Sequence, residues 1–171
     1  HHALAARAMG FCFFNSAAVT AAALADRGER VLVVDVDAHH GNGTQDIFYD
    51  DPSVMYASTH QMPLFPGTGA ASETGVGNIV NVPLAARSGK EEMMAAYEGT
   101  ILPRLTEFRP DFLMISAGFD ADYRDPLAQL NWRPEDFSWL TMKLKDVANA
   151  CCAGRIVSML EGGYDRQGLA T

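Results

Sequence analysis

The sequence predicts an α/β fold with an open, mostly parallel sheet flanked by helices. Apolar runs of strand length alternate with helical segments, and Gly, Pro and polar residues separate them. The runs at 31–34 and 112–115 are apolar throughout, which is typical of strands buried on both faces of a sheet. The 171 residues, 48% of them hydrophobic, are enough for one domain with a sizeable core.

The first half of the chain predicts one long helix and three strands. The Ala-rich helix covers residues 16–26 and ends before Gly28, a residue that suits a helix C-cap. The strands are expected at 30–36, 54–59 and 79–82. Between them we expect a turn, a short helical turn and a long Gly- and Pro-rich loop, at 41–43, 44–48 and 60–77.

The second half predicts two further helices and two strands. Residues 90–108 form a helix that Pro103 should kink or break, because proline has no backbone N–H to donate. A strand, a long loop, a helix and a fifth strand are expected next, at 112–117, 118–133, 134–153 and 156–160. Connections longer than about 15 residues are uncommon in compact domains, so both long loops are candidates for function.

Acidic and imidazole side chains gather where the expected strands end, which is where open parallel sheets bind ligands. Asp35, Asp37 and His39 alternate after the first strand, so an extended chain would point all three to one side. Asp120 follows the fourth strand, and Tyr164 follows the fifth on a Gly-Gly hinge. Two Asp and one His with an open position form the ligand set of a catalytic metal site.

Each of these residues has a structural alternative when it is taken alone. An Asp at a strand end often forms a turn or caps a helix, and a lone His is often an ordinary surface or core residue. Here, however, four of the five histidines form adjacent pairs, at 1–2 and 39–40. Acids that converge in a buried position are costly without a cation. We therefore predict a metal site.

Composition excludes several classes of function. The 13 basic and 21 acidic residues give a net charge of −8, which argues against broad nucleic-acid binding, since that requires a basic face. No apolar run approaches the roughly 20 residues of a membrane-spanning helix. The three cysteines, Cys12, Cys151 and Cys152, imply no disulfide framework and favour a reducing compartment. Neither nucleic acid nor a membrane is expected as a partner.

Several motifs occur in an order that matches one known family. They are HHA at 1–3, GFCFFN at 10–15, VDVDAHHGNGTQDIFYDDPSV at 34–54, FPGTG at 65–69, SAGFDADYRDPL at 116–127 and LEGGY at 160–164. With these motifs the chain resembles the zinc-dependent histone deacetylase superfamily, which includes class II and bacterial acetoin-utilisation and acetylpolyamine amidohydrolase proteins. The resemblance implies an arginase–deacetylase type of fold. Residues 1–171 would be part of a single deacetylase catalytic domain, with an incomplete sheet.

The resemblance implies zinc-dependent hydrolysis of the acetyl amide of acetyl-lysine side chains. Asp37, His39 and Asp120 would bind the zinc, and the same ligand types also accept ferrous iron. A structural potassium ion would bind the side chains of Asp35 and Ser58. Backbone carbonyls would complete the potassium site, those of Asp37, His39 and Thr59.

The resemblance also implies roles for the residues around the metal. His2 would be the general base and then the acid toward the leaving amine. Asn42 would be its partner, where many members have an Asp, and this leaves the imidazole less cationic. His1, paired with Asp35, would be an electrostatic partner, and Tyr164 would donate a hydrogen bond to the oxyanion.

A tunnel for the acyl-lysine side chain is implied by four further residues. Phe11 and Phe65 would form its walls, although without the resemblance both would be assigned to the core. Gly10 would offer its carbonyl to the substrate amide. Leu127 would lie on the wall where one polyamine-selective branch has a Glu, so its lack of charge favours acetyl-lysine peptides.

Three alternative functions follow from the same residues. The first is hydrolysis of acetylpolyamines or other small acylated amines. The second, a binuclear manganese ureohydrolase, needs more bridging Asp residues than the sequence offers. The third is an inactive metal-binding interaction module, which should have lost a ligand, a catalytic His or the Tyr, yet all are present. A bacterial, cytoplasmic location and a homo-oligomer are the expected context.

The ends of the chain suggest a piece of a longer protein. It starts at His1 without a Met and stops after the start of a helix. A sheet without its outer elements exposes apolar surface, so we expect the isolated 171-residue chain to fold poorly or to aggregate. Size-exclusion chromatography and thermal melting test this expectation, and a soluble monomer that melts cooperatively would contradict it.

Overall fold

The computed structural model describes residues 1–170 and contains a five-stranded, all-parallel sheet. The strand order is β3-β2-β1-β4-β5. The strands are β1 (Val31–Asp35), β2 (Val54–Gln61), β3 (Ile79–Leu84), β4 (Phe112–Ala117) and β5 (Ile156–Leu160). This architecture confirms the predicted α/β class with a parallel sheet.

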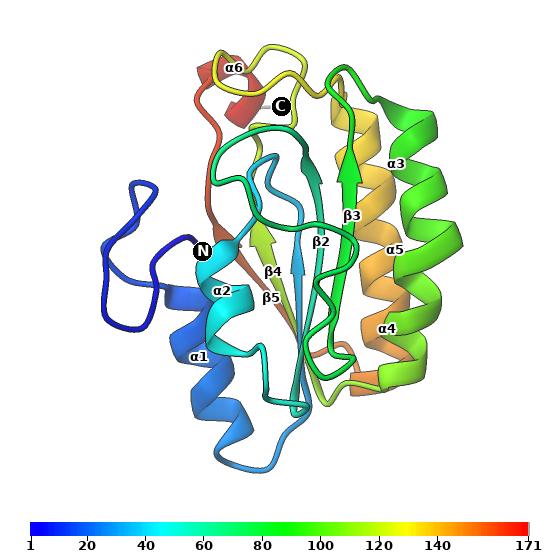
Figure 1. The fold of residues 1–171 in the computed structure, drawn as a ribbon. Coiled ribbons are helices and arrows are strands. Elements are labelled where there is room, and N and C mark those ends of the chain that lie inside the picture. Colours follow the sequence, from blue (N-terminus) through cyan, green and yellow to red (C-terminus); the bar gives the residue numbers. More distant parts are fainter. Residues whose placement is uncertain (171) are drawn as a thin grey trace.

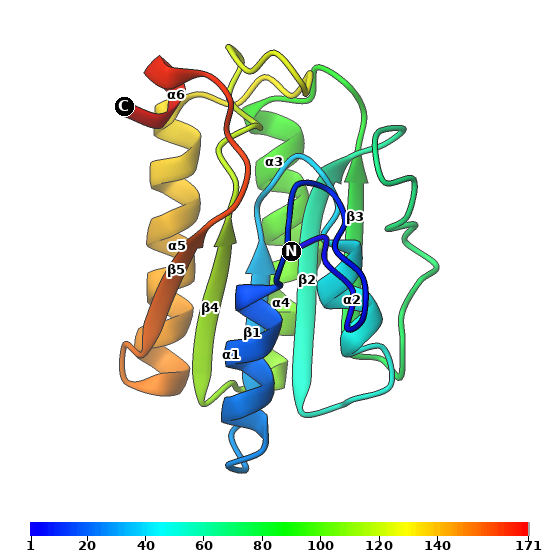
Figure 2. The same cartoon turned by 90° about the vertical axis from the view of Figure 1, so that its left-hand side faces the viewer.

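Helices cover both faces of the sheet (Figures 1 and 2). One face carries α1 (Ser16–Ala25) and α2 (Asn42–Ile47). The opposite face carries α3 (Lys90–Ala96), α4 (Leu102–Phe108) and α5 (Pro134–Cys152). The short helix α6 (Arg166–Ala170) lies above the carboxyl ends of the strands.

The strands β1, β2 and β4 are buried on both sides because successive side chains enter two different cores, whereas β5 is partly exposed. Leu32 and Val34 of β1 pack with the side chains of α3, α4 and α5. Val31 and Val33 pack on the other face, where α1 contributes mostly small side chains such as Ala18 and Ala21, together with Leu24. This arrangement explains why the strand reads as a continuous apolar run rather than as an alternating pattern.

The predicted break in the helix at 90–108 is confirmed. Helix α3 passes into a π-helical turn, Tyr97–Ile101, and α4 begins at Leu102 with Pro103 as its second residue. Proline has no N–H for the carbonyl four residues earlier, so a regular α-helix cannot continue through this point. The π turn keeps Tyr97 and Ile101 fully buried against the sheet.

Two predicted strands were too short, and one predicted helix began too late. Strand β2 continues to Gln61 and β3 continues to Leu84, each two residues further than expected. Strand β3 contains Pro83, which is tolerated because β3 is an edge strand. Helix α2 begins at Asn42 instead of residue 44.

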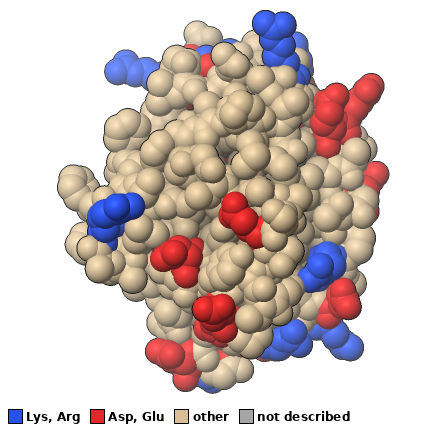
Figure 3. Space-filling view, viewed as in Figure 1, with Lys and Arg blue, Asp and Glu red and all other residues tan. Residues whose placement is uncertain are grey.

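Much of the surface is uncharged and partly apolar. Figure 3 shows acidic and basic side chains scattered over one face, with a broad uncharged area between them. Phe11, Phe13 and Phe14 are each more than 80% exposed. Within residues 1–170, no helix combines the length and the apolar character needed to cross a bilayer.

Candidate metal centre and active site

The chain bends sharply after β1, and this bend places the first two candidate ligands. The backbone N–H of Asp37 donates to Asp35 Oδ1 over 3.1 Å, and that of His39 donates to Asp37 Oδ1 over 2.8 Å. The expectation of an extended chain with all three side chains on one side was therefore wrong. Carboxylates that accept from the backbone two residues on favour turns over strands.

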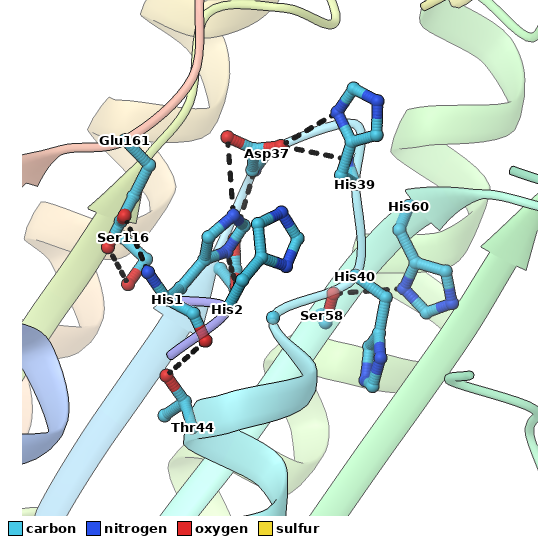
Figure 4. A network of polar contacts seen from close by, with 12 residues as sticks. His1, His2, Asp37, His39, His40, Thr44, Ser58, His60, Ser116 and Glu161 are labelled. Atoms are coloured by element: carbon cyan, nitrogen blue, oxygen red, sulfur yellow. Dashed lines mark hydrogen bonds and ion pairs between the residues drawn. The ribbon is translucent and has the colours of Figure 1, made fainter. Parts of the chain in front are cut away.

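Asp37 and His39 from this bend meet Asp120, which follows β4. One ligand atom from each lies within 4.8 Å of the other two. His39 Nδ1 is 2.6 Å from Asp120 Oδ2 and 3.4 Å from Asp37 Oδ1. The two aspartates are buried and His39 is 12% exposed. The predicted Asp–His–Asp triad is thus brought together at the carboxyl edge of the sheet, as Figure 4 shows for Asp37 and His39.

The electrostatics of the triad suit a divalent cation. Burial raises the pKa of Asp120, and the adjacent Asp37 carboxylate raises it further. Burial opposes a charged imidazole at His39, but hydrogen bonds to Asp120 and Asp37 outweigh it and raise the pKa of His39 to about 9. His39 and Asp120 therefore favour their protonated forms, and a metal ion would replace these protons. At Asp37, by contrast, burial is outweighed by the charge of His1 and the hydrogen bonds from His39, which lower the pKa of this carboxyl.

The proton held by His39 leads to a pH prediction for metal binding. A metal binds deprotonated imidazole, so protons compete for Nδ1 at any pH below the pKa of about 9. Zinc affinity should therefore rise by at least about tenfold per pH unit between roughly pH 6 and pH 8, and more steeply at the acidic end, where Asp120 also holds a proton. Competition titration against a chelator of known pH dependence measures this slope. An affinity that stays constant over this range would contradict the prediction.

Two glycines let the backbone approach the triad closely. A Cβ at Gly118 would collide with the side chain and the Cα of Asp37. A Cβ at Gly162 would lie 2.7 Å from carboxylate oxygens of both Asp37 and Asp120. Because the backbone at Gly162 comes this close, its N–H donates a hydrogen bond to Asp37 Oδ2 over 2.8 Å. Such contacts orient a ligand for its metal.

Substitution of Gly118 should therefore weaken metal binding without changing a ligand. We expect Gly118→Ala to lower zinc affinity about 10- to 100-fold, the usual cost of disturbing the surroundings of a ligand. Calorimetric titration with zinc measures the change. Gly99→Ala is the matched control, because a Cβ there meets nothing within 4 Å. Equal affinity in the two variants would contradict the prediction.

The histidine pair beside the triad consists of two rings in different charge states. His2 Nδ1 lies 2.9 Å from Asn42 Oδ1, while the Asn42 amide nitrogen donates to the His2 carbonyl. The His2 Nδ1–H is therefore the donor, and Nε2 keeps its lone pair. Burial, followed by the charge of His1, lowers the pKa of His2 to about 4. This ring is neutral and free to accept a proton.

His1 is held by two carboxylates instead of an amide. Its Nδ1 lies 2.7 Å from Asp35 Oδ2, and its Nε2 lies 3.7 Å from Asp37 Oδ2. Burial lowers the pKa of His1, but Asp35 and then Asp37 outweigh this effect and raise it well above the usual value. The His1 and His2 ring centroids are 4.1 Å apart, so a charged imidazole lies directly beside a neutral one.

Tyr164 approaches the triad from the segment after β5. The chain turns at Gly163, whose φ of +132° favours glycine, and brings the phenol to the same cavity as His2 and His39. Burial, and then the charges of Asp37 and Asp120, raise the pKa of Tyr164 to about 12. The phenol is therefore a hydrogen-bond donor throughout the physiological pH range.

An apolar cavity of about 490 Å³ leads to these groups. All four residues predicted for a substrate tunnel, Gly10, Phe11, Phe65 and Leu127, line it together with Leu64. Gly10 and Phe11 both have positive φ, and a Cβ at Gly10 would collide with the His2 ring. Phe11 is 86% and Phe65 is 47% exposed, so neither is the core residue that the sequence without the resemblance would suggest.

The residues predicted for a potassium site lie on neighbouring strands. Asp35 of β1 and Ser58 of β2 are partners in the parallel register, and Thr59 follows. All three are fully buried. The Ser58 hydroxyl lies 2.9 Å from His60 Nδ1 (Figure 4).

Several residues around the site escaped the sequence reasoning. Tyr56 donates to Asp35 Oδ2 over 2.9 Å, and Asp125 accepts the backbone N–H of Tyr164 over 2.8 Å. Glu161 accepts a hydrogen bond from Ser116 and lines a second cavity of about 300 Å³ behind the histidine pair. Of these residues, only Asp125 and Glu161 could have been found from the sequence, because each lies in a motif that also contains a predicted site residue.

Comparisons with known proteins agree with the fold and with the resemblance that the motifs indicate. The model of the family described as histone deacetylase domain matches residues 1–171. The chain is 41% identical over 177 residues to Histone deacetylase 10, chloroplastic, of Oryza sativa subsp. japonica, covering 100% of this chain and 40% of the relative. It is 42% identical over 173 residues to a probable deacetylase of Archaeoglobus fulgidus, covering 98% and 48%.

Two solved structures share the fold. The crystal structure of the HDA15 HD domain aligns with a TM-score of 0.93 at 42% identity, covering 99% of this chain and 49% of that one. The histone deacetylase Clr3 aligns with a TM-score of 0.86 at 35% identity, covering 95% and 29%. The chain thus spans less than half the length of each of these relatives and structures.

The parallel sheet, with a candidate metal triad at its carboxyl edge, and its likeness to the two solved structures define an α/β domain of the arginase–deacetylase fold. The resemblance that the motifs indicate is confirmed by the match over the entire chain. The chain belongs to the histone deacetylase family. Its relatives come from a plant and an archaeon, so a bacterial, cytoplasmic location stays a prediction.

Proposed function

We propose that the protein hydrolyses the acetyl amide of acetyl-lysine side chains with a zinc ion held by Asp37, His39 and Asp120. One observation carries this proposal. His39 of the candidate metal triad, the neutral imidazole of His2 and the protonated phenol of Tyr164 line one apolar cavity. Such a cavity suits a four-methylene chain that ends in a neutral amide.

A zinc ion held by Asp37, His39 and Asp120 would supply Lewis-acid polarisation of the acetyl carbonyl and would lower the pKa of water. His2 Nε2 takes a proton from the water as its oxygen bonds to the carbonyl carbon. Tyr164 donates a hydrogen bond to the developing oxyanion. The carbon–nitrogen bond then breaks, His2 returns the proton to the leaving amine, and acetate remains. Ferrous iron would suit the same ligands.

The remaining site residues bind or tune rather than react. Asn42 holds the tautomer of His2, and the charged His1 favours the negative charge that develops nearby. Phe11 and Phe65 would grip the methylene chain, and Gly10 would accept from the substrate amide. A potassium ion bound by the predicted oxygen ligands would stabilise this region.

Acetylpolyamine hydrolysis is the alternative that uses the same chemistry. Leu127 favours acetyl-lysine, because it presents an uncharged, half-exposed side chain to the cavity where one polyamine-selective branch of the family has a Glu. An inactive interaction module is disfavoured, since all three ligands, both histidines and the tyrosine are present. We propose that residues 1–171 form part of one catalytic domain. A homo-oligomer remains a prediction.

Acetate release by the zinc-loaded, full-length protein tests the proposed function. An acetyl-lysine peptide and an N-acetylated diamine are compared at equal concentration. We expect a higher kcat/KM for the peptide. A preference for the diamine would favour the polyamine alternative, and no turnover of either with zinc bound at one equivalent would favour the inactive module.

A further inference from the structure

The carboxylate of Asp125 joins two parts of the site that lie far apart in the sequence. It stands in the loop between β4 and α5 and is only 9% exposed. Its Oδ1 accepts the backbone N–H groups of Leu127 over 2.8 Å and of Ala128 over 3.2 Å. Its Oδ2 accepts the backbone N–H of Tyr164 over 2.8 Å. One side chain therefore binds both the cavity wall and the residue that carries the phenol.

The loop that presents Asp125 is itself well fixed. The Asp125 N–H donates to the carbonyl of Asp122 over 2.9 Å. The Asp122 carboxylate, almost fully buried, binds the guanidinium of Arg124 through two hydrogen bonds of 2.7 and 2.8 Å. Backbone bonds from Tyr123 to Trp132 and from Trp132 to Ala121 close the loop. Asp125 is thus a rigid acceptor.

The Tyr164 segment needs such an acceptor because its own backbone is turned and glycine-rich. Gly162 is held between Asp37 Oδ2 and the N–H of Phe119. The chain then passes through Gly163 before it reaches Tyr164, whose side chain is 43% exposed. Side-chain packing therefore constrains the phenol only partly, and the backbone bond to Asp125 constrains it at the Tyr164 amide.

We propose that Asp125 is a positioning residue that holds the phenol of Tyr164 in register with the Leu127 wall of the substrate cavity. This inference rests on the proposed function, in which Tyr164 stabilises the oxyanion. Because Asp125 binds the backbone of both Leu127 and Tyr164, it fixes the position of the oxyanion donor relative to the cavity wall. A displacement of about 1 Å at a reacting centre can cost about 100-fold in rate, so this bond matters for catalysis more than for binding.

Asp125→Asn removes one acceptor and keeps the size of the side chain. An amide has one oxygen, so its NH₂ must face one of the three converging N–H groups. The oxygen satisfies two donors at Leu127 and Ala128, which leaves the NH₂ against Tyr164. We expect kcat to fall about 10- to 100-fold and KM to change less than about threefold.

Asp136→Asn is the matched control. Asp136 is also a buried carboxylate that accepts a backbone N–H, that of Arg133, but it lies at the start of α5. This variant should lower the melting temperature while kcat stays within about twofold. If Asp125→Asn reduces kcat no more than Asp136→Asn does, the proposal is overturned.

A double-mutant cycle on kcat shows whether Asp125 acts through Tyr164. In a Tyr164→Phe background the phenol no longer donates, so Asp125→Asn should cost at most about twofold more. Full additivity of the two losses would contradict the proposal.

Hydrogen exchange tests the same bond without activity. The Tyr164 amide should exchange at least about tenfold faster in Asp125→Asn than in the parent or in Asp136→Asn. Unchanged exchange overturns the positioning role. A parent protein that releases no acetate, together with faster exchange in Asp125→Asn, would refute the proposed function while the structural role of Asp125 stands.

Discussion

Asp120→Ala is expected to lower kcat/KM for acetate release by at least about 1,000-fold, or roughly 4 kcal/mol of transition-state stabilisation. Asp120 contributes one of the three triad side chains. Its Oδ2 lies 2.6 Å from His39 Nδ1, so its loss also removes the partner that orients this imidazole. Two remaining ligands hold zinc weakly, and the chemistry that depends on the metal fails with it.

The measurement pairs acetate release with metal content. Zinc per protein is determined by mass spectrometry after dialysis, in the parent, in Asp120→Ala and in the isosteric Asp120→Asn. Both variants should lose metal and turnover together. Asp136→Asn serves as control, because this buried carboxylate caps α5 away from the triad. Retention of one zinc and of more than a tenth of the activity in Asp120→Ala would remove Asp120 from the ligand set.

Tyr164→Phe is expected to lower kcat about 100- to 1,000-fold, the range measured when one oxyanion donor is removed. The substitution keeps the ring, its packing and its contact with Phe11. The ring centroids of Phe11 and Tyr164 are 6.4 Å apart. KM should change less than about threefold, because a ground-state carbonyl gains little from the phenol. The raised pKa of Tyr164, about 12, keeps the donor protonated in any ordinary assay buffer.

Steady-state kinetics with an acetyl-lysine peptide separate kcat from KM for this variant. Zinc content is measured in the same samples and should equal that of the parent, because Tyr164 is outside the triad. Tyr49→Phe is the control, since Tyr49 is a partly exposed tyrosine at the end of α2. A kcat within threefold of the parent would mean that another group stabilises the oxyanion.

The fold class was predictable because burial on both faces leaves a pattern that is local in the sequence. Each strand appears as a short apolar run, and each connection appears as a cluster of Gly, Pro and polar residues. Strand ends were less predictable. Pro83 lies within β3, and its place there depends on β3 being an edge strand, which is a property of the entire sheet.

The candidate site was predictable in its residues, including the pairs His1–Asp35 and His2–Asn42, but only partly in its geometry. Alternation of Asp35, Asp37 and His39 suggested a common direction, yet hydrogen bonds from the backbone turn the chain. Asp35 therefore faces His1 and Tyr56 rather than the triad. The error arose because a strand was extended beyond the residue at which its sheet pairing ends.

By itself, the sequence determined which functional groups the candidate site contains. Carboxylates, imidazoles and a phenol at the ends of parallel strands are fixed by composition and order, and strand ends meet at one edge of a sheet. Only the tertiary structure decided which groups touch. Gly118 against Asp37, and Asp125 against Tyr164, are contacts between residues distant in the sequence. Charge state and orientation depend on burial and on such neighbours, which no local pattern records.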